Sequence, residues 1–204
     1  MFMVHDLARR EREQFADLLD GLTPEQWAAP SMCTGWTVRD VAAHTIAYLD
    51  QSRISLNCAM FATRWNVDRL NQRALEEFHL IGPARLAELM RQEARPTGAG
   101  ALYGGRVALI ETLIHQQDIR RPLRLPRTID TASLRTALAY ARISPVIGGA
   151  RRTRGLRLIA TDLDWAAGSG PEVHGCGEAL LLAMTGRAEQ LTGELAGDGV
   201  ELLR

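Results

Sequence analysis

Apolar residues recur at helical spacing through most of this chain, in segments that glycine and proline separate. Such spacing predicts amphipathic helices, each of which must bury one face against a neighbour. Helices are expected at His5–Leu19, after Thr23, and at Val38–Asn57, Arg64–Phe78, Pro83–Ala94, Arg106–Arg120 and Ala132–Ile143. At 204 residues the chain is long enough to bury a core without help from disulfides. The sequence therefore predicts a helical bundle over residues 1–149.

The pattern changes near Gly148 and Gly149. Downstream, short apolar runs bounded by turn residues predict strands, and one longer segment predicts a helix. The expected strands are Leu156–Thr161, Asp164–Gly170 and Val200–Leu203, with the helix at Gly177–Leu191. We therefore expect a mainly α protein in which a small α/β domain, residues 150–204, follows the bundle.

Composition disfavours a nucleic-acid-binding, membrane-spanning or secreted protein. The formal net charge is zero, which disfavours nucleic-acid binding, and no long apolar run predicts a membrane span. The N-terminus has no secretory pattern, and the three scattered cysteines fit reduced thiols, so a cytoplasmic protein is expected. All 24 Lys+Arg residues are arginine. This bias fits a GC-rich genome such as those of actinobacteria, and it leaves no lysine for catalysis.

Glu111 and His115 are the most suggestive pair for chemistry. They lie four residues apart on a predicted helix, so their side chains share one face, one turn apart. Catalytic zinc typically has three protein ligands, and bundle cores supply ligands from facing helices. His44 is the histidine placed in the middle of another helix among apolar neighbours. We therefore predict a site for zinc or another divalent metal at His44, Glu111 and His115.

Other interpretations of these residues stay open at this stage. A Glu and a His one turn apart also occur in helices that bind no metal, and a half-buried histidine often only hydrogen-bonds within a core. Asp40 and Asp118 are candidates to orient the histidines, or else a helix cap and a polar residue at a helix end. Cys33 is either a reactive thiol at the mouth of the site or an ordinary buried cysteine.

Three motifs in order carry a resemblance to a known family. Residues 33–44 (CTGWTVRDVAAH) and 111–118 (ETLIHQQD) resemble the GWTVRDVxAH and E-x-x-x-H-x-x-D signatures of the mycothiol-dependent maleylpyruvate isomerase family. The tail, with residues 160–165, 168–170 and 185–187, is similar to the C-terminal domain of that family. The resemblance spans nearly the whole chain.

The resemblance implies a DinB-like four-helix bundle, and zinc held by His44, Glu111 and His115. It also implies an active-site arginine in the C-terminal domain, which Arg187 matches best. By this resemblance the chain is a mycothiol-dependent isomerase or S-transferase in which a metal-bound thiolate attacks an electrophilic small molecule. The expected partners are that electrophile and the thiol, and the expected assembly is a monomer or homodimer.

Two alternatives remain at this stage. The first is an enzyme of the same bundle that uses another thiol or activates water for hydrolysis. The second is a non-catalytic module that binds a metal or ligand, because a fold does not guarantee an activity.

Overall fold

The computed structural model describes residues 3–49, 52, 58, 61–64 and 66–203 of the chain. The chain divides into two compact units, Met1–Pro126 and Arg127–Arg204, each of which has its own packing. Within the described residues, no helix combines the length and the apolar character needed to cross a membrane.

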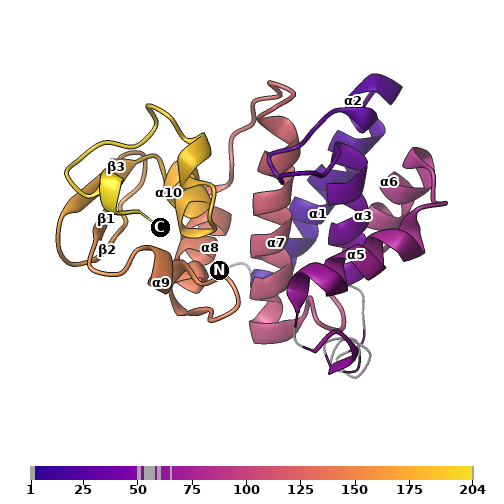
Figure 1. Cartoon of the computed structure of the whole chain (residues 1–204), viewed down its shortest axis with the longest axis horizontal. Helices are drawn as coiled ribbons and strands as arrows, with labels where there is room; N and C mark the ends of the chain where they lie inside the picture. Colours follow the sequence, from indigo (N-terminus) through magenta and orange to yellow (C-terminus); the bar gives the residue numbers. More distant parts are fainter. Residues whose placement is uncertain (1–2, 50–51, 53–57, 59–60, 65, 204) are drawn as a thin grey trace. The chain divides into compact units, whose positions relative to one another are not determined.

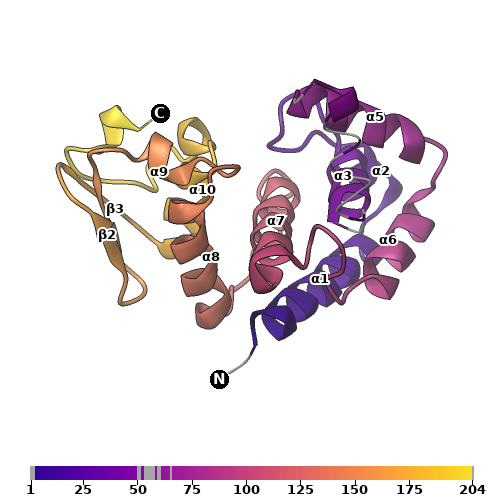
Figure 2. The same cartoon turned by 90° about the horizontal axis from the view of Figure 1, so that it is seen from below.

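The first unit is a bundle of helices (Figures 1 and 2). Its helices are α1 (Val4–Asp20), α2 (Pro24–Ala28), α3 (Val38–Leu49), α5 (Val67–Phe78), α6 (Pro83–Gln92) and α7 (Leu102–Arg120). Both α1 and α3 pack against α6 and against α7, so these four helices enclose a common core, and α5 packs on α3. The predicted helical bundle is confirmed.

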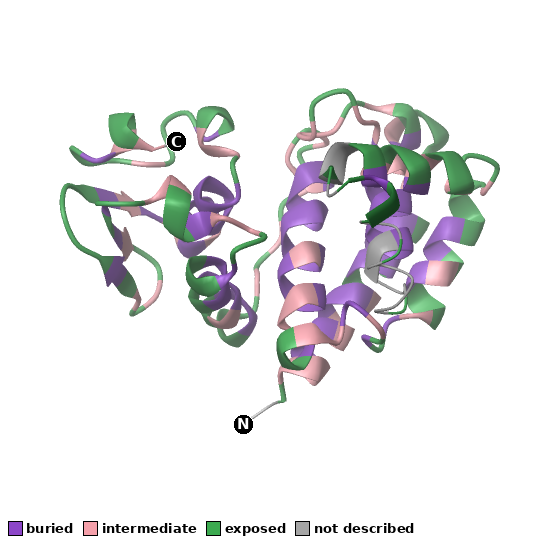
Figure 3. Ribbon diagram, turned by 60° about the horizontal axis from the view of Figure 1, so that its bottom comes forward, coloured by how far each residue is buried: buried purple, intermediate pink, exposed green. Residues whose placement is uncertain are grey.

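The core of the first unit draws buried side chains from all four of these helices. Phe15 and Leu19 on α1, Val41 on α3, Met90 on α6 and Ile119 on α7 are almost completely excluded from solvent. Most residues of α7 between Ala108 and Ile119 are buried (Figure 3). Apolar burial on this scale stabilises the bundle by about 1.5–3 kcal/mol for each large side chain. The functional side chains described below therefore stand on packed helices.

Local signals set where the helices begin. Thr23 and Gln26 form the predicted capping box of α2, with the Thr23 N–H donating to Gln26 Oε1 at 2.9 Å. Thr37 and Asp40 cap α3 in the same way, since Asp40 Oδ2 accepts from the Thr37 backbone N–H at 3.0 Å. In both cases a side chain satisfies a backbone group that the helix leaves without a partner.

The expected bounds of α3 and α7 can be compared with those of the structure. The expected continuation of α3 to Asn57 falls largely on residues outside the described part of the chain. Helix α7 starts at Leu102, before the expected Arg106, but Tyr103, Gly104 and Gly105 have positive φ. Regular helical geometry therefore begins at Arg106, as the pattern predicts.

The second unit combines a small sheet with helices. Strands β1 (Arg157–Ala160), β2 (Ala166–Gly168) and β3 (Glu172–Gly175) lie in the order β2-β1-β3, with β1 antiparallel to β2 and parallel to β3. Its helices are α8 (Thr131–Ile143), α9 (Gly149–Arg152) and α10 (Gly177–Met184), followed by the 3-10 helices η1 (Ala188–Gln190) and η2 (Val200–Leu202). The expected α/β character and the first two strands are confirmed, whereas the sequence pattern does not predict β3.

The expected final strand at Val200–Leu203 is wrong. Residues 200–202 form a 3-10 helix in which the Leu202 N–H donates to the Gly199 carbonyl at 3.1 Å. The chain instead pairs with β3 slightly earlier, through the bridge between His174 and Ala196. An apolar run of four residues has no period long enough to distinguish a strand from a helical turn.

Helix α8 belongs with the second unit by its packing. It packs against α9 and α10. The boundary between the two units along the sequence falls between Pro126 and Arg127, before α8 begins. The sequence pattern instead predicts a boundary after residue 149, because α8 has the same helical periodicity as the bundle helices. Periodicity identifies a helix but does not say which neighbour covers its apolar face.

Candidate metal centre

Helices α3 and α7 bring His44, Glu111 and His115 together. One ligand atom from each residue lies within 4.8 Å of the others. The imidazole rings of His44 and His115 have centroids 5.0 Å apart at 86°, and His115 Nε2 lies 3.1 Å from Glu111 Oε2. These are the three residues that the sequence singles out, and the packing of α3 on α7 places them in one cluster.

The donor set fits zinc. Two imidazoles and one carboxylate are a ligand set that catalytic zinc sites use, with a fourth position left for water or substrate. His44 and His115 are buried, while the side chain of Glu111 keeps 17% of its exposure. The cluster is therefore shielded by the bundle but is not sealed from solvent on the side of Glu111.

Asp118 fixes the orientation of His115. Its Oδ2 lies 2.9 Å from His115 Nδ1, and its side chain is fully buried. A carboxylate accepts and does not donate, so this contact assigns the proton of the neutral imidazole to Nδ1. Nε2 is then left as the atom with a lone pair on the side of Glu111 and His44. A carboxylate in this position commonly orients a metal-binding histidine.

The pKa of His115 is raised well above its ordinary value in the metal-free chain. Burial alone lowers this pKa, but hydrogen bonds with Asp118, Cys33 and Glu111 together outweigh it. These hydrogen bonds and the charge of Asp118 thus favour a positive charge at this position. A bound cation would take the place of the proton at Nε2, on the side of Glu111, while Nδ1–H stays with Asp118.

The turn at residues 31–36 supports both histidines. Its Cys33 Sγ donates to Asp118 Oδ2 at 3.2 Å, and its Trp36 ring lies edge-on to His44 with centroids 5.1 Å apart. Cys33, His115 and Asp118 form a second group whose donor atoms lie within 4.8 Å of one another. No sequence pattern indicates the contact between Cys33 and Asp118, because 85 positions separate them.

Asp40 has the capping role, which is one of the two interpretations that the sequence leaves open. Its Oδ2 accepts from the Thr37 hydroxyl at 2.7 Å as well as from the Thr37 N–H. Its neighbour Arg39 lies on the same helix and donates to three backbone carbonyls at and just past the end of α5. Two polar residues of the motif around His44 therefore have local structural roles.

Arg187 lies in the second unit, just after the end of α10. Gly186, with φ of +90°, ends this helix in a Schellman motif, in which the Arg187 N–H donates to Leu182 O at 3.0 Å. The Arg187 side chain donates to the Thr185 carbonyl at 2.7 Å. The structure thus gives Gly186 a clear helix-ending role, and the catalytic role of Arg187 stays a prediction.

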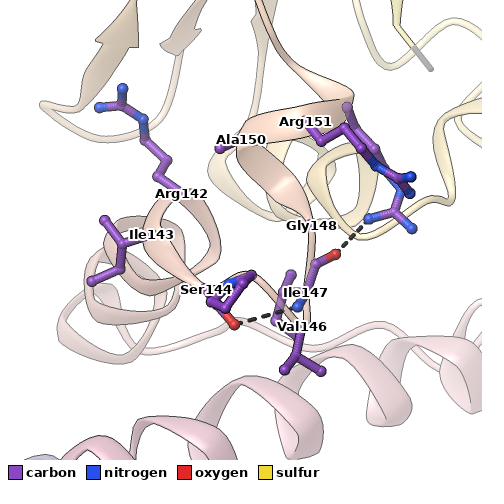
Figure 4. A pocket seen from close by; sticks show the side chains of 10 residues that line it. Arg142, Ile143, Ser144, Val146, Ile147, Gly148, Ala150 and Arg151 are labelled. Carbon is purple, nitrogen blue, oxygen red and sulfur yellow. Dashed lines mark hydrogen bonds between the residues drawn. The ribbon is translucent and has the colours of Figure 1, made fainter. Parts of the chain in front are cut away.

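A cavity of about 420 Å³ in the second unit is lined by arginine and apolar side chains (Figure 4). Arg142, Arg151 and Arg152 line it together with the exposed Ile143 and Val146. Burial lowers the pKa of Arg152, and the neighbouring charges of Arg151 and Arg187 lower it further. This part of the second unit therefore has a local excess of positive charge.

Comparison with known proteins agrees with the motifs. Residues 8–57 match the family model described as the mycothiol maleylpyruvate isomerase N-terminal domain. Two solved structures, of a mycothiol-dependent maleylpyruvate isomerase and of its histidine-to-alanine mutant, match with a TM-score of 0.60 each. They are 17% and 16% identical to this chain, and each match covers 97% of it and 96% of the other chain. No curated protein matches.

The family match falls on α1 to α3 and includes His44, while the structural match covers both units. The resemblance seen in the motifs is therefore confirmed, and so is the expected fold class. Residues 8–57 thus match the model of the mycothiol maleylpyruvate isomerase N-terminal domain, and nearly the whole chain shares the fold of a solved mycothiol-dependent maleylpyruvate isomerase.

Proposed function

We propose that this protein is a metal-dependent enzyme that uses mycothiol to isomerise an electrophilic small molecule. The observation that carries the proposal is the cluster of His44, Glu111 and His115, whose donor atoms lie within 4.8 Å of one another. The family match over residues 8–57 and the shared fold are the reasons for proposing mycothiol as the thiol and isomerisation as the reaction.

Each of the three residues would supply one zinc ligand. His44 and His115 offer neutral imidazole nitrogens, and Glu111 offers a carboxylate that offsets part of the metal charge. Asp118 holds His115 in the required tautomer through Nδ1. When bound, the metal supplies positive charge that favours the thiolate form of a thiol at neutral pH.

The proposed reaction needs no net redox change. The thiol adds across a conjugated cis double bond, forming a C–S bond and leaving a C–C single bond that rotates. Elimination then breaks the C–S bond, returns the thiol and leaves the trans double bond. An S-transferase would keep the C–S bond in its product, which makes the two reactions separable by product analysis.

Arg187 is proposed to bind a carboxylate of the substrate. Guanidinium groups bind carboxylates through two parallel hydrogen bonds, and the neighbouring Arg151 and Arg152 strengthen the positive potential in this part of the second unit.

The proposal is tested first by metal content and then by turnover. The purified chain is loaded with zinc and analysed beside His44→Ala and His115→Ala. We expect about one zinc per chain in the unsubstituted protein and loss of that zinc in both variants. His79→Ala is the matched control, since His79 is an exposed histidine at the end of α5.

Turnover then separates the enzyme from the alternatives. Maleylpyruvate is incubated with mycothiol, with glutathione and with no thiol, and the products are identified. Isomerisation that occurs with mycothiol but not with glutathione or without a thiol supports the proposal. A stable thioether product would indicate a transferase. Zinc uptake without turnover of maleylpyruvate or of a panel of related electrophiles would favour a non-catalytic metal-binding module.

A further inference from the structure

The thiol of Cys33 contacts the buried carboxylate that holds His115. Cys33 Sγ donates to Asp118 Oδ2 at 3.2 Å, and the same oxygen accepts from His115 Nδ1 at 2.9 Å. Oδ2 of Asp118 is thus shared by two donors from different parts of the bundle. One donor is on α7 itself, and the other comes from the turn that precedes α3.

The turn holds Cys33 firmly in this position. The hydroxyl of Ser31 accepts from the Cys33 N–H at 3.1 Å, and the Trp36 N–H donates to the Cys33 carbonyl at 2.9 Å. Gly35 has φ of +80°, a conformation that favours glycine and closes the turn tightly. The Met32 N–H also donates to the backbone carbonyl of Asp118 at 2.9 Å. Backbone and side chain together therefore fasten this turn to α7 at Asp118.

The terminal torsion of a carboxylate has a broad energy minimum, so each further bond narrows the orientations that it can adopt. The bond from Cys33 adds a restraint on Oδ2 from the turn that precedes α3, beside the bond from His115. We propose that Cys33 is a positioning residue, which acts through Asp118 to hold His115 with Nε2 toward the metal donors. This inference rests on the proposed metal site, and it gives Cys33 a role as a hydrogen-bond donor rather than as a nucleophile or metal ligand.

Zinc affinity is the direct readout, measured by competition with a chromophoric chelator. Partners that orient metal ligands typically contribute about 10- to 100-fold in metal affinity. Because Cys33 acts one step behind Asp118, we expect Cys33→Ala to weaken zinc binding by about 10-fold, at the low end of that range. Cys33→Ser keeps a donor of similar size and should restore most of the affinity. Cys176→Ala is the matched control, because Cys176 is a half-buried N-cap thiol in the second unit.

A double-mutant cycle tests whether the effect passes through Asp118. If it does, Cys33→Ala has no further effect on zinc affinity in the Asp118→Ala background. Additive losses would instead indicate that Cys33 acts through general packing, and they would overturn the proposal. Thermal unfolding of each metal-free variant identifies any that do not fold. If Cys33→Ala does not fold, Cys33→Val, which keeps a side chain of similar size but removes the donor, replaces it in the same comparison with Cys33→Ser.

Cobalt substitution distinguishes positioning from ligation. With Co²⁺ in the site, Cys33→Ala should shift the visible d–d bands as His115 reorients, and the unsubstituted protein should lack an intense thiolate charge-transfer band. Such a band, lost in Cys33→Ala, would show that Cys33 is a ligand and would overturn the proposal. Zinc uptake that is unchanged by Cys33→Ala would overturn this inference alone. Failure of the unsubstituted chain to take up any metal would overturn both it and the proposed function.

Discussion

The imidazole rings of His44 and His115 lie nearly perpendicular, with centroids 5.0 Å apart, although the two residues come from different helices. The turn at residues 31–36 contacts the surroundings of both rings, through Trp36 beside His44 and Cys33 beside Asp118. One rigid turn therefore supports both histidines. The arrangement brings the two imidazoles of the proposed metal site together from two helices.

Zinc affinity should rise with pH. The pKa of His115 is raised in the metal-free chain, so zinc must displace a proton from this imidazole. Zinc binding should therefore strengthen as the pH rises toward the raised pKa of His115. At pH values below that pKa, zinc binding should release a proton. Calorimetry in buffers of different ionisation enthalpy measures that proton.

The control for proton release is His79→Gln. His79 is exposed and lies outside the donor set, so its loss should leave the proton count unchanged. A zinc affinity that does not vary with pH between about 6 and 8 would contradict the prediction, since an ordinary histidine titrates near 6.5.

The stability of the metal-free protein should fall as pH rises. Because the pKa of His115 is higher in the folded chain than in the unfolded chain, the folded state binds more protons between the two values. The extra stability is complete below about pH 6.5, the unfolded value, and disappears as pH rises through the folded pKa. The slope from one proton is at most about 1.4 kcal/mol per pH unit.

Urea unfolding in the presence of a chelator measures this dependence. His115→Gln removes the titrating group and should flatten the curve over the same range. A metal-free protein whose unfolding free energy increases from pH 6.5 upward would contradict the expected sign.

Arg39 should matter for stability and not for metal binding. Its Nη2 donates to the carbonyls of Phe78, His79 and Ile81 at 2.6, 2.8 and 2.9 Å, which ties α3 to the chain at the end of α5. Arg39→Ala removes a charged donor from these carbonyls and should lower the free energy of unfolding by about 1.5–3 kcal/mol.

Arg73→Ala is the control for Arg39, because Arg73 is an exposed arginine on α5. It should change stability by less than about 0.5 kcal/mol. Both variants should bind one zinc per chain. An Arg39→Ala variant as stable as the unsubstituted protein would show that these bonds are formed equally well by water.

Local spacing predicts the parts of the structure that depend on neighbours in sequence. The capping box at Thr23 and the pairing of Glu111 with His115 both lie within one helical turn, so the pattern determines them. His44 requires a choice among the four histidines other than His115, and both its mid-helix position and the motif point to it.

Contacts between distant segments are not predictable in the same way. The bond from Cys33 to Asp118 joins residues 85 positions apart, and it depends on the exact path of a glycine-containing turn. The packing of α8 with α9 and α10, and the 3-10 turn at Val200, likewise depend on which neighbour covers a short apolar face. Sequence periodicity carries no information on that choice.

Arg187→Lys should separate substrate binding from metal binding. Lysine keeps the charge but loses the fork that pairs with a carboxylate, and a charge-assisted hydrogen bond contributes about 1.5–3 kcal/mol. We therefore expect kcat/KM for maleylpyruvate to fall by about 10- to 100-fold, with one zinc still bound per chain. Arg154→Lys, at an exposed arginine in the same unit, should retain full turnover. Unchanged turnover in Arg187→Lys would remove this residue from the proposed site. Loss of zinc would instead mean that the substitution disturbs the first unit, since His44, Glu111 and His115 all belong to it.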